Sequence, residues 1–92
     1  MSAHLAVTHE PAQQRFTLPT TPASVLDYQL LPGRVVFTHT GVPSHYQGQG
    51  LAARLVEAGL QWAQGQGLKV VPACSYVQVY IERHPEWQGL LA

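Results

Sequence analysis

Charged residues are scarce in this chain, since five Lys and Arg balance five Asp and Glu and the four types make up 11% of the 92 residues. An ordinary soluble domain carries about 25% charged residues. Without a basic excess, no positive field is available to hold a nucleic acid backbone or an anionic membrane, so we expect neither partner. A surface with so few charged residues favours association, which makes a homodimer a candidate assembly.

Cysteine is also nearly absent. Cys74 stands alone and has no partner for an internal disulfide, which agrees with a reducing compartment. Residues 1–11 contain no apolar core of the length of a secretory signal, and no stretch approaches the roughly 20 apolar residues of a membrane span. We therefore expect a soluble, cytoplasmic protein. No His or Cys spacing resembles a metal site, and none is expected.

The chain is nevertheless apolar enough to fold, because 46% of its residues are hydrophobic. Ninety-two residues are enough for one small domain. We expect a flexible N-terminal arm over residues 1–12 and a single domain over residues 13–92. This size leaves little room for a second function.

The hydrophobic pattern predicts an α/β domain. Alternating apolar residues indicate strands at 13–18, 25–31 and 34–40, joined by Pro- and Gly-containing turns into an antiparallel meander. The apolar period then changes, and residues 51–64 show the amphipathic stripe of a helix. A short buried strand follows at 68–71. A second helix is expected at 75–83, with Ser75 as its N-cap.

A glycine-rich turn precedes the first helix. Glycine permits positive φ and close approach of the backbone to a ligand, while the first amides of a helix have no partner inside it. No Ser, Asp or Asn stands just before the helix to cap these amides. Phosphate is the natural occupant of such a site. The turn and the helix start comprise Gln47, Gly48, Gln49, Gly50, Leu51 and Ala52.

This turn has the pattern Q-x-x-G-x-A, which resembles the diphosphate loop of the GNAT N-acetyltransferase superfamily. Three further segments strengthen the likeness, and together they resemble minimal, single-domain GNAT-like proteins: HTGVP at 39–43, VVPACSYV at 70–77 and RHPEW at 83–87. The resemblance covers residues 15–91. It implies a small GNAT-type fold with a mixed sheet, in which the meander is followed by a helix, a parallel strand and a helix.

The resemblance also implies a ligand, acetyl-CoA. The loop from Gln47 to Ala52 would hold its diphosphate, and the backbone of Val42 would bond the pantetheine amides. The implied activity is transfer of an acetyl group to an amine of unknown identity. Minimal members of the family lack the early helices that shape an acceptor pocket in larger acetyltransferases, so the acceptor site would be open.

Three residues are candidates for the chemistry. Tyr80 corresponds to the tyrosine that protonates the CoA sulfur in larger relatives, although it equally fits a packing role. Cys74 lies where a strand meets a helix, where the helix dipole favours a thiolate, and the alternative is a small buried hydrophobe. His39 is a candidate base with an ordinary pKa near 6.5, or a structural residue. Relatives often carry an acidic residue at the position of Gly41, so a carboxylate base is missing here.

Two other functions remain open at this point. The first is a CoA-binding or protein-interaction module that keeps the fold without catalysis, which the small size and Gly41 favour. The second is a nucleotide-binding P-loop, which is disfavoured because no Gly-Lys-Ser/Thr follows the glycines.

Overall fold

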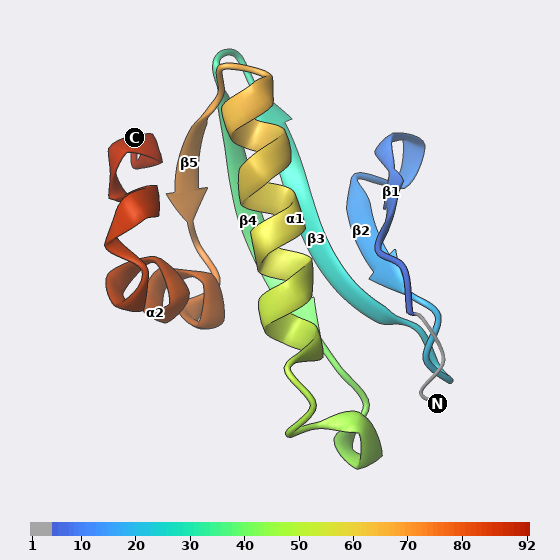
Figure 1. The fold of residues 1–92 in the computed structure, drawn as a ribbon. Coiled ribbons are helices and arrows are strands. Elements are labelled where there is room, and N and C mark those ends of the chain that lie inside the picture. Colours follow the sequence, from blue (N-terminus) through green and yellow to red (C-terminus); the bar gives the residue numbers. More distant parts are fainter. Residues whose placement is uncertain (1–4) are drawn as a thin grey trace.

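The computed structural model describes residues 5–92, which form a five-stranded sheet, two α-helices and short 3₁₀ turns (Figure 1). The strands are β1 Thr8–Glu10, β2 Arg15–Leu18, β3 Ser24–Leu31, β4 Arg34–Gly41 and β5 Lys69–Pro72. The helices are α1 Leu51–Gly65 and α2 Ser75–Arg83, and the 3₁₀ turns are Pro11–Gln13, Ser44–Tyr46 and Pro85–Leu90.

The sheet is mixed, as predicted. Strands β1 to β4 pair antiparallel in chain order, and β5 pairs parallel to β4. Parallel neighbours need a long crossover, which α1 supplies. The expected order of meander, helix, parallel strand and helix is confirmed. No helix between residues 5 and 92 is long and apolar enough to cross a bilayer.

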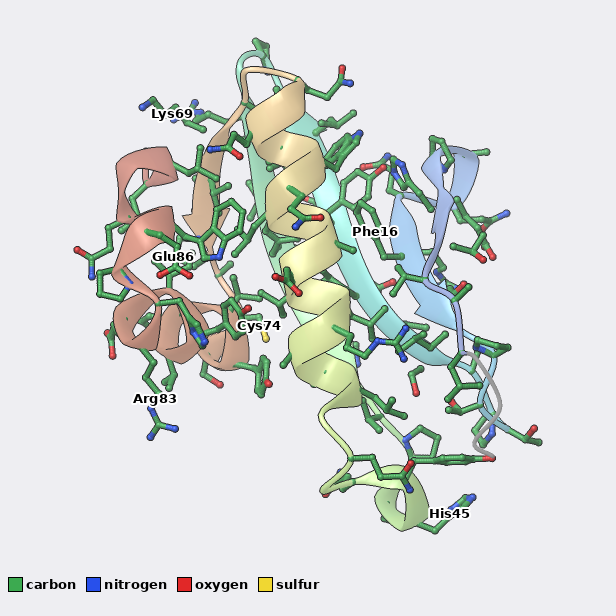
Figure 2. All side chains as sticks on the ribbon, viewed as in Figure 1. Phe16, His45, Lys69, Cys74, Arg83 and Glu86 are labelled. Carbon is green, nitrogen blue, oxygen red and sulfur yellow. The ribbon has the colours of Figure 1, made fainter. Side chains whose placement is uncertain are left out.

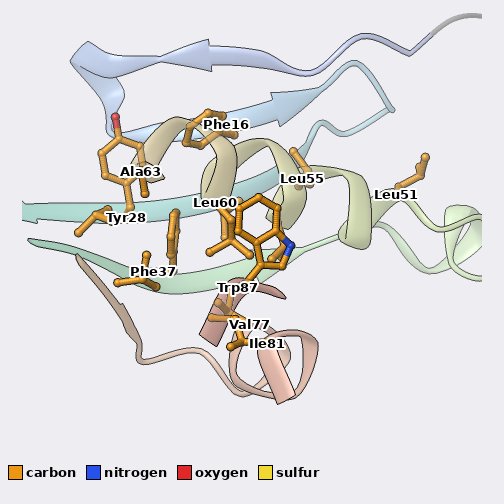
Figure 3. Packing of buried hydrophobic residues seen from close by; sticks show 14 of the residues in the cluster. Phe16, Tyr28, Phe37, Leu51, Leu55, Leu60, Ala63, Val77, Ile81 and Trp87 are labelled. Atoms are coloured by element: carbon orange, nitrogen blue, oxygen red, sulfur yellow. The ribbon is translucent and has the colours of Figure 1, made fainter. Parts of the chain in front are cut away.

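One hydrophobic cluster joins both helices to one face of the sheet (Figure 3). Alternate strand residues such as Leu26, Val35 and Phe37 point into it and are fully buried. Helix α1 contributes its apolar stripe, and α2 contributes Val77 and Ile81. The domain therefore has two layers, with α1 lying across the middle of the sheet (Figure 1).

Helix α1 lies close against the sheet at Gly59. A Cβ atom at this position would lie 2.9 Å from Cδ2 of Leu26 and 3.0 Å from Cε1 of Phe37. Glycine is thus required here by space and not by backbone conformation. The contact sets how deeply the helix lies on the strands.

Strand β1 corrects the expectation of a flexible arm over residues 1–12. Thr8–Glu10 pairs with β2, and His9 stands opposite Phe16. Residues 1–4 of the expected arm lie outside the described residues. The strand was missed because three residues are too few to show an alternating pattern, and because histidine does not register as an apolar residue.

An aromatic cluster holds β1 in place. The His9 ring stacks on Phe16 with centroids 4.2 Å apart, and its Nε2 lies 2.6 Å from the Tyr28 hydroxyl. Trp62 of α1 meets the same ring edge-on at 4.9 Å. Burial lowers the pKa of His9 below its ordinary value, so the neutral imidazole is the form that fits the cluster.

A bulge in β4 changes which side chains face the helices. Asp27 pairs with His39 and Tyr28 pairs with Phe37, which leaves Thr38 as the extra residue. Beyond it, Thr40 pairs with the buried Leu26 and therefore points to the helix side. The bulge thus brings Thr40 toward the helices.

The C-terminal segment folds back onto the domain. Leu91 forms a parallel bridge with Val70 at the free edge of β5, and Trp87 is buried in the core. The expected cap of α2 is wrong by one position, because Cys74 is the N-cap residue and Ser75 is already helical.

Candidate functional site

Strands β4 and β5 separate after a short pairing. Their register ends at Phe37 opposite Pro72, and the amide of Cys74 then donates to the Phe37 carbonyl at 3.0 Å. Beyond this point no strand among residues 5–92 pairs with that side of β4. The last part of β4 therefore has a free backbone edge, which an extended ligand can use for hydrogen bonds.

An open cavity of about 520 Å³ lies beside this edge and extends to the start of α1. Six of the seven residues predicted to bind the cofactor line it; Gln49 is the exception. The nine lining residues are Thr40, Val42, Tyr46, Gln47, Gly48, Gly50, Leu51, Ala52 and Tyr76. Of these, Thr40, Tyr46 and Tyr76 were not predicted as site residues.

The start of α1 offers unpaired backbone amides to this cavity. Gly50 is the N-cap residue with φ of 75°, and no side chain caps the helix. Gly48 has φ of 87°, and a Cβ atom at either glycine would meet nothing within 4 Å. Positive φ explains why glycine is needed at both positions. The free amides and the positive end of the helix dipole suit an anion such as a diphosphate.

Gln47 fixes the loop that leads into the helix. Its Nε2 donates to the Val42 carbonyl at 3.2 Å, which ties the end of β4 to the glycine turn. The Val42 carbonyl was expected to be available to a ligand. The bond from Gln47 uses one of the two hydrogen bonds that a carbonyl oxygen can accept. Gln47 is therefore a residue that shapes the loop.

Cys74 lies at the start of α2, with its sulfur on the side toward α1 (Figure 2). Burial alone would raise the pKa of the thiol, but hydrogen bonds from the side chain and backbone of Thr40 and from the Val77 and Tyr76 amides outweigh it. The net result is a lowered pKa for Cys74. The Thr40 hydroxyl oxygen lies 3.4 Å from the sulfur. The sequence predicted the effect of the helix start, while the contribution of Thr40 depends on the fold.

The two tyrosines of α2 differ in their relation to the cavity. Tyr76, in the first turn, lines the cavity, whereas the predicted proton donor Tyr80 does not. The Tyr80 ring stacks on His84 at 4.0 Å. Burial raises the pKa of both tyrosines, and the charges of Glu57 and Glu86 raise that of Tyr80 further. Both hydroxyls are therefore protonated at neutral pH. The sequence did contain a sign that Tyr76 belongs to the site, because it stands only two residues after the candidate Cys74.

His39 is not brought to the cavity. It pairs with Asp27 after the bulge, on the sheet face that points away from the helices. Its Nε2 lies over Gly41, where an added Cβ atom would be only 3.1 Å away. The imidazole thus occupies the space that a side chain at position 41 would fill. Among residues 5–92, no group of three or more His, Cys, Asp or Glu side chains is arranged to hold a metal ion.

Comparison with known proteins decides the family. The profile described as GCN5-related N-acetyl-transferase matches residues 15–90. The chain belongs to this family. It is 32% identical to Protein NATD1 of Gallus gallus over 85 residues, which cover 88% of this chain and 77% of that protein. Protein NATD1 of Homo sapiens is also 32% identical over 85 residues, which cover 88% of this chain and 75% of that protein.

A solved structure agrees on the fold. The solution structure of a GCN5-like protein from Staphylococcus aureus superimposes with a TM-score of 0.79 at 21% identity, covering 99% of this chain and 91% of the other. At this identity the likeness shows the fold alone. The predicted minimal GNAT-like family and fold are both confirmed.

Proposed function

We propose that this GNAT-family protein is an acetyl-CoA-dependent N-acyltransferase that moves an acetyl group to an amine. The observation that carries the proposal is that one cavity is bordered by two sets of backbone hydrogen-bonding groups. One set lies at the uncapped start of α1, and the other lies along the free edge of β4. A ligand with an anionic diphosphate and an extended amide-bearing arm matches both.

In this proposal the amides around Gly48 and Gly50 hold the diphosphate. The arm runs along β4 past Val42 and Thr40, so that its thioester comes toward the start of α2. Binding of this kind positions the carbonyl carbon for attack, which is the main source of acceleration when two reactants are held together.

The reaction itself is direct attack by the amine on the thioester carbonyl. The new C–N bond forms, the C–S bond breaks, the amine nitrogen gives up a proton to water, and the departing CoA thiolate takes a proton. We assign the proton donor to Tyr76, because it lines the cavity, in place of Tyr80 one helical turn further on. His39 faces the other side of the sheet, so we assign no proton transfer within the cavity to it.

Cys74 does not itself line the cavity, but its sulfur lies 3.4 Å from the hydroxyl oxygen of Thr40, which does. It offers a second route to the same product. Its thiolate would attack the thioester, release CoA and carry the acetyl group until an amine removes it. The lowered pKa of Cys74 favours this route. Intact-mass spectra after incubation with acetyl-CoA would then show an acetyl adduct that hydroxylamine removes and that Cys74→Ala abolishes.

The alternative function is a CoA-binding or protein-interaction module without catalysis. It is favoured by the position of His39 and Tyr80, since neither predicted proton carrier lines the cavity. A thioester absorbance assay with acetyl-CoA and a broad set of amines and peptides separates the two functions. The enzyme releases more than one equivalent of CoA per chain only when an accepted amine is present. Binding of acetyl-CoA without release above background supports the module, and no binding contradicts both the enzyme and a CoA-binding module.

A further inference from the structure

The cavity is lined without charge. None of its nine lining residues is Lys, Arg, His, Asp or Glu. CoA carries two kinds of phosphate, a diphosphate in the chain of the molecule and a separate monoester at the ribose 3′ position. A phosphate monoester carries roughly −1.5 to −2 charges near neutral pH, and proteins usually recognise it through Arg or Lys. The lining offers no such group.

The two basic side chains next to the cavity in sequence, Arg54 and His45, do not line it. Arg54 follows the helix start, but its guanidinium donates to the Leu5 carbonyl of the N-terminal segment. His45 precedes the glycine turn, and its ring packs on Tyr46 with centroids 4.5 Å apart, outside the lining.

The other Lys and Arg side chains within residues 5–92 lie away from the glycine turn. Arg15 forms an ion pair with Asp27 at 3.3 Å. Lys69 bonds to the Gly89 carbonyl and stands opposite Arg34 at the far end of β4. Arg83 ends α2, while the cavity meets the first turn of that helix. Figure 2 shows Lys69 and Arg83 well apart from His45 and the turn that carries it.

We propose that the site recognises the diphosphate and the thioester arm of its CoA donor and does not recognise the 3′-phosphate. This inference rests on the proposed function and specifies its donor. Backbone amides and the helix dipole act on the diphosphate, which every CoA analogue with an intact chain retains. The 3′-phosphate stays in water. CoA thioesters with and without this phosphate are therefore equivalent ligands.

Isothermal titration of the intact chain with CoA, dephospho-CoA and pantetheine tests this selectivity. We expect the Kd values of CoA and dephospho-CoA to agree within about threefold, and pantetheine, which lacks the diphosphate, to bind at least about tenfold more weakly. If dephospho-CoA binds more than about threefold more weakly than CoA, the inference is wrong while the proposed function stands. If no compound binds the folded protein, both are wrong.

Arg54→Gln provides a second test, with Arg83→Gln as the matched control at the end of α2. Because Arg54 bonds to Leu5, its loss is expected to leave the CoA affinity within about threefold of that of the control. A larger loss for CoA with unchanged dephospho-CoA affinity would mean that Arg54 turns to the 3′-phosphate, and it would overturn the inference. If Arg54→Gln does not fold, the three-ligand comparison on the unaltered chain decides.

Discussion

The contact of α1 with the sheet at Gly59 leads to a test of the packing that orients the candidate site. Gly59→Ala adds one methyl group within 2.9 to 3.1 Å of Leu26 and Phe37, and both of these side chains are fully buried. Such overpacking costs about 1–3 kcal/mol, whereas Ala in place of Gly in a helix gains about 1 kcal/mol. We expect a net loss of up to about 2 kcal/mol, since the methyl group has no space into which it can move.

Gly65→Ala is the matched control in the same helix, because a Cβ atom there meets nothing within 4 Å. This variant is expected to be neutral or up to about 1 kcal/mol more stable. Urea unfolding followed by circular dichroism measures both changes, and the thermal midpoint of Gly59→Ala should fall by about 4–8 °C per kcal/mol. If Gly59→Ala stabilises the protein as much as Gly65→Ala does, the described position of α1 is wrong.

Three further predictions concern individual side chains. Thr40→Val should raise the pKa of Cys74 and slow its alkylation at neutral pH, while Thr40→Ser restores both; an unchanged pH profile of iodoacetamide reaction contradicts the contact. Because burial lowers the pKa of folded His9, the unfolded chain binds its proton more readily, so stability is full above about pH 6.5 and falls as the pH drops below it. His9→Phe should weaken the pH dependence of the free energy of unfolding, measured with urea between pH 7 and 5. An equal pH dependence in both proteins would contradict the lowered pKa of His9. If the chain turns over acetyl-CoA, Tyr76→Phe should reduce the rate of CoA release more than Tyr80→Phe, and the reverse order would return the proton donor to Tyr80.

The sequence predicted the elements whose patterns are long and repetitive. The stripe of α1 and the alternation in β3 and β4 gave the right elements, because each pattern spans at least seven residues. The glycines before α1 were also interpreted correctly, since positive φ at Gly48 and Gly50 is a local backbone property. Local chemistry of this kind can be predicted from one chain.

The features that were missed depend on contacts between distant segments. The bulge at Thr38 reverses which residues face the helices, and for this reason His39 points away from the cavity while Thr40 reaches Cys74. No alternation pattern reveals an inserted residue in advance. Strand β1 was likewise missed, since it is held by an aromatic cluster that only the folded chain assembles.

Calorimetric titration of coenzyme A into glycine variants tests the central claim most directly, namely that the glycine turn and the start of α1 hold a diphosphate. Gly48→Val and Gly50→Val force a side chain into positive φ at the cavity, and Gly33→Val imposes the same strain in the distant β3–β4 turn. We predict that the unaltered chain and Gly33→Val bind with similar affinity, and that both loop variants, once shown to be folded, bind at least about tenfold more weakly. Equal binding by all four folded proteins, or no binding by the unaltered chain, would contradict the claim.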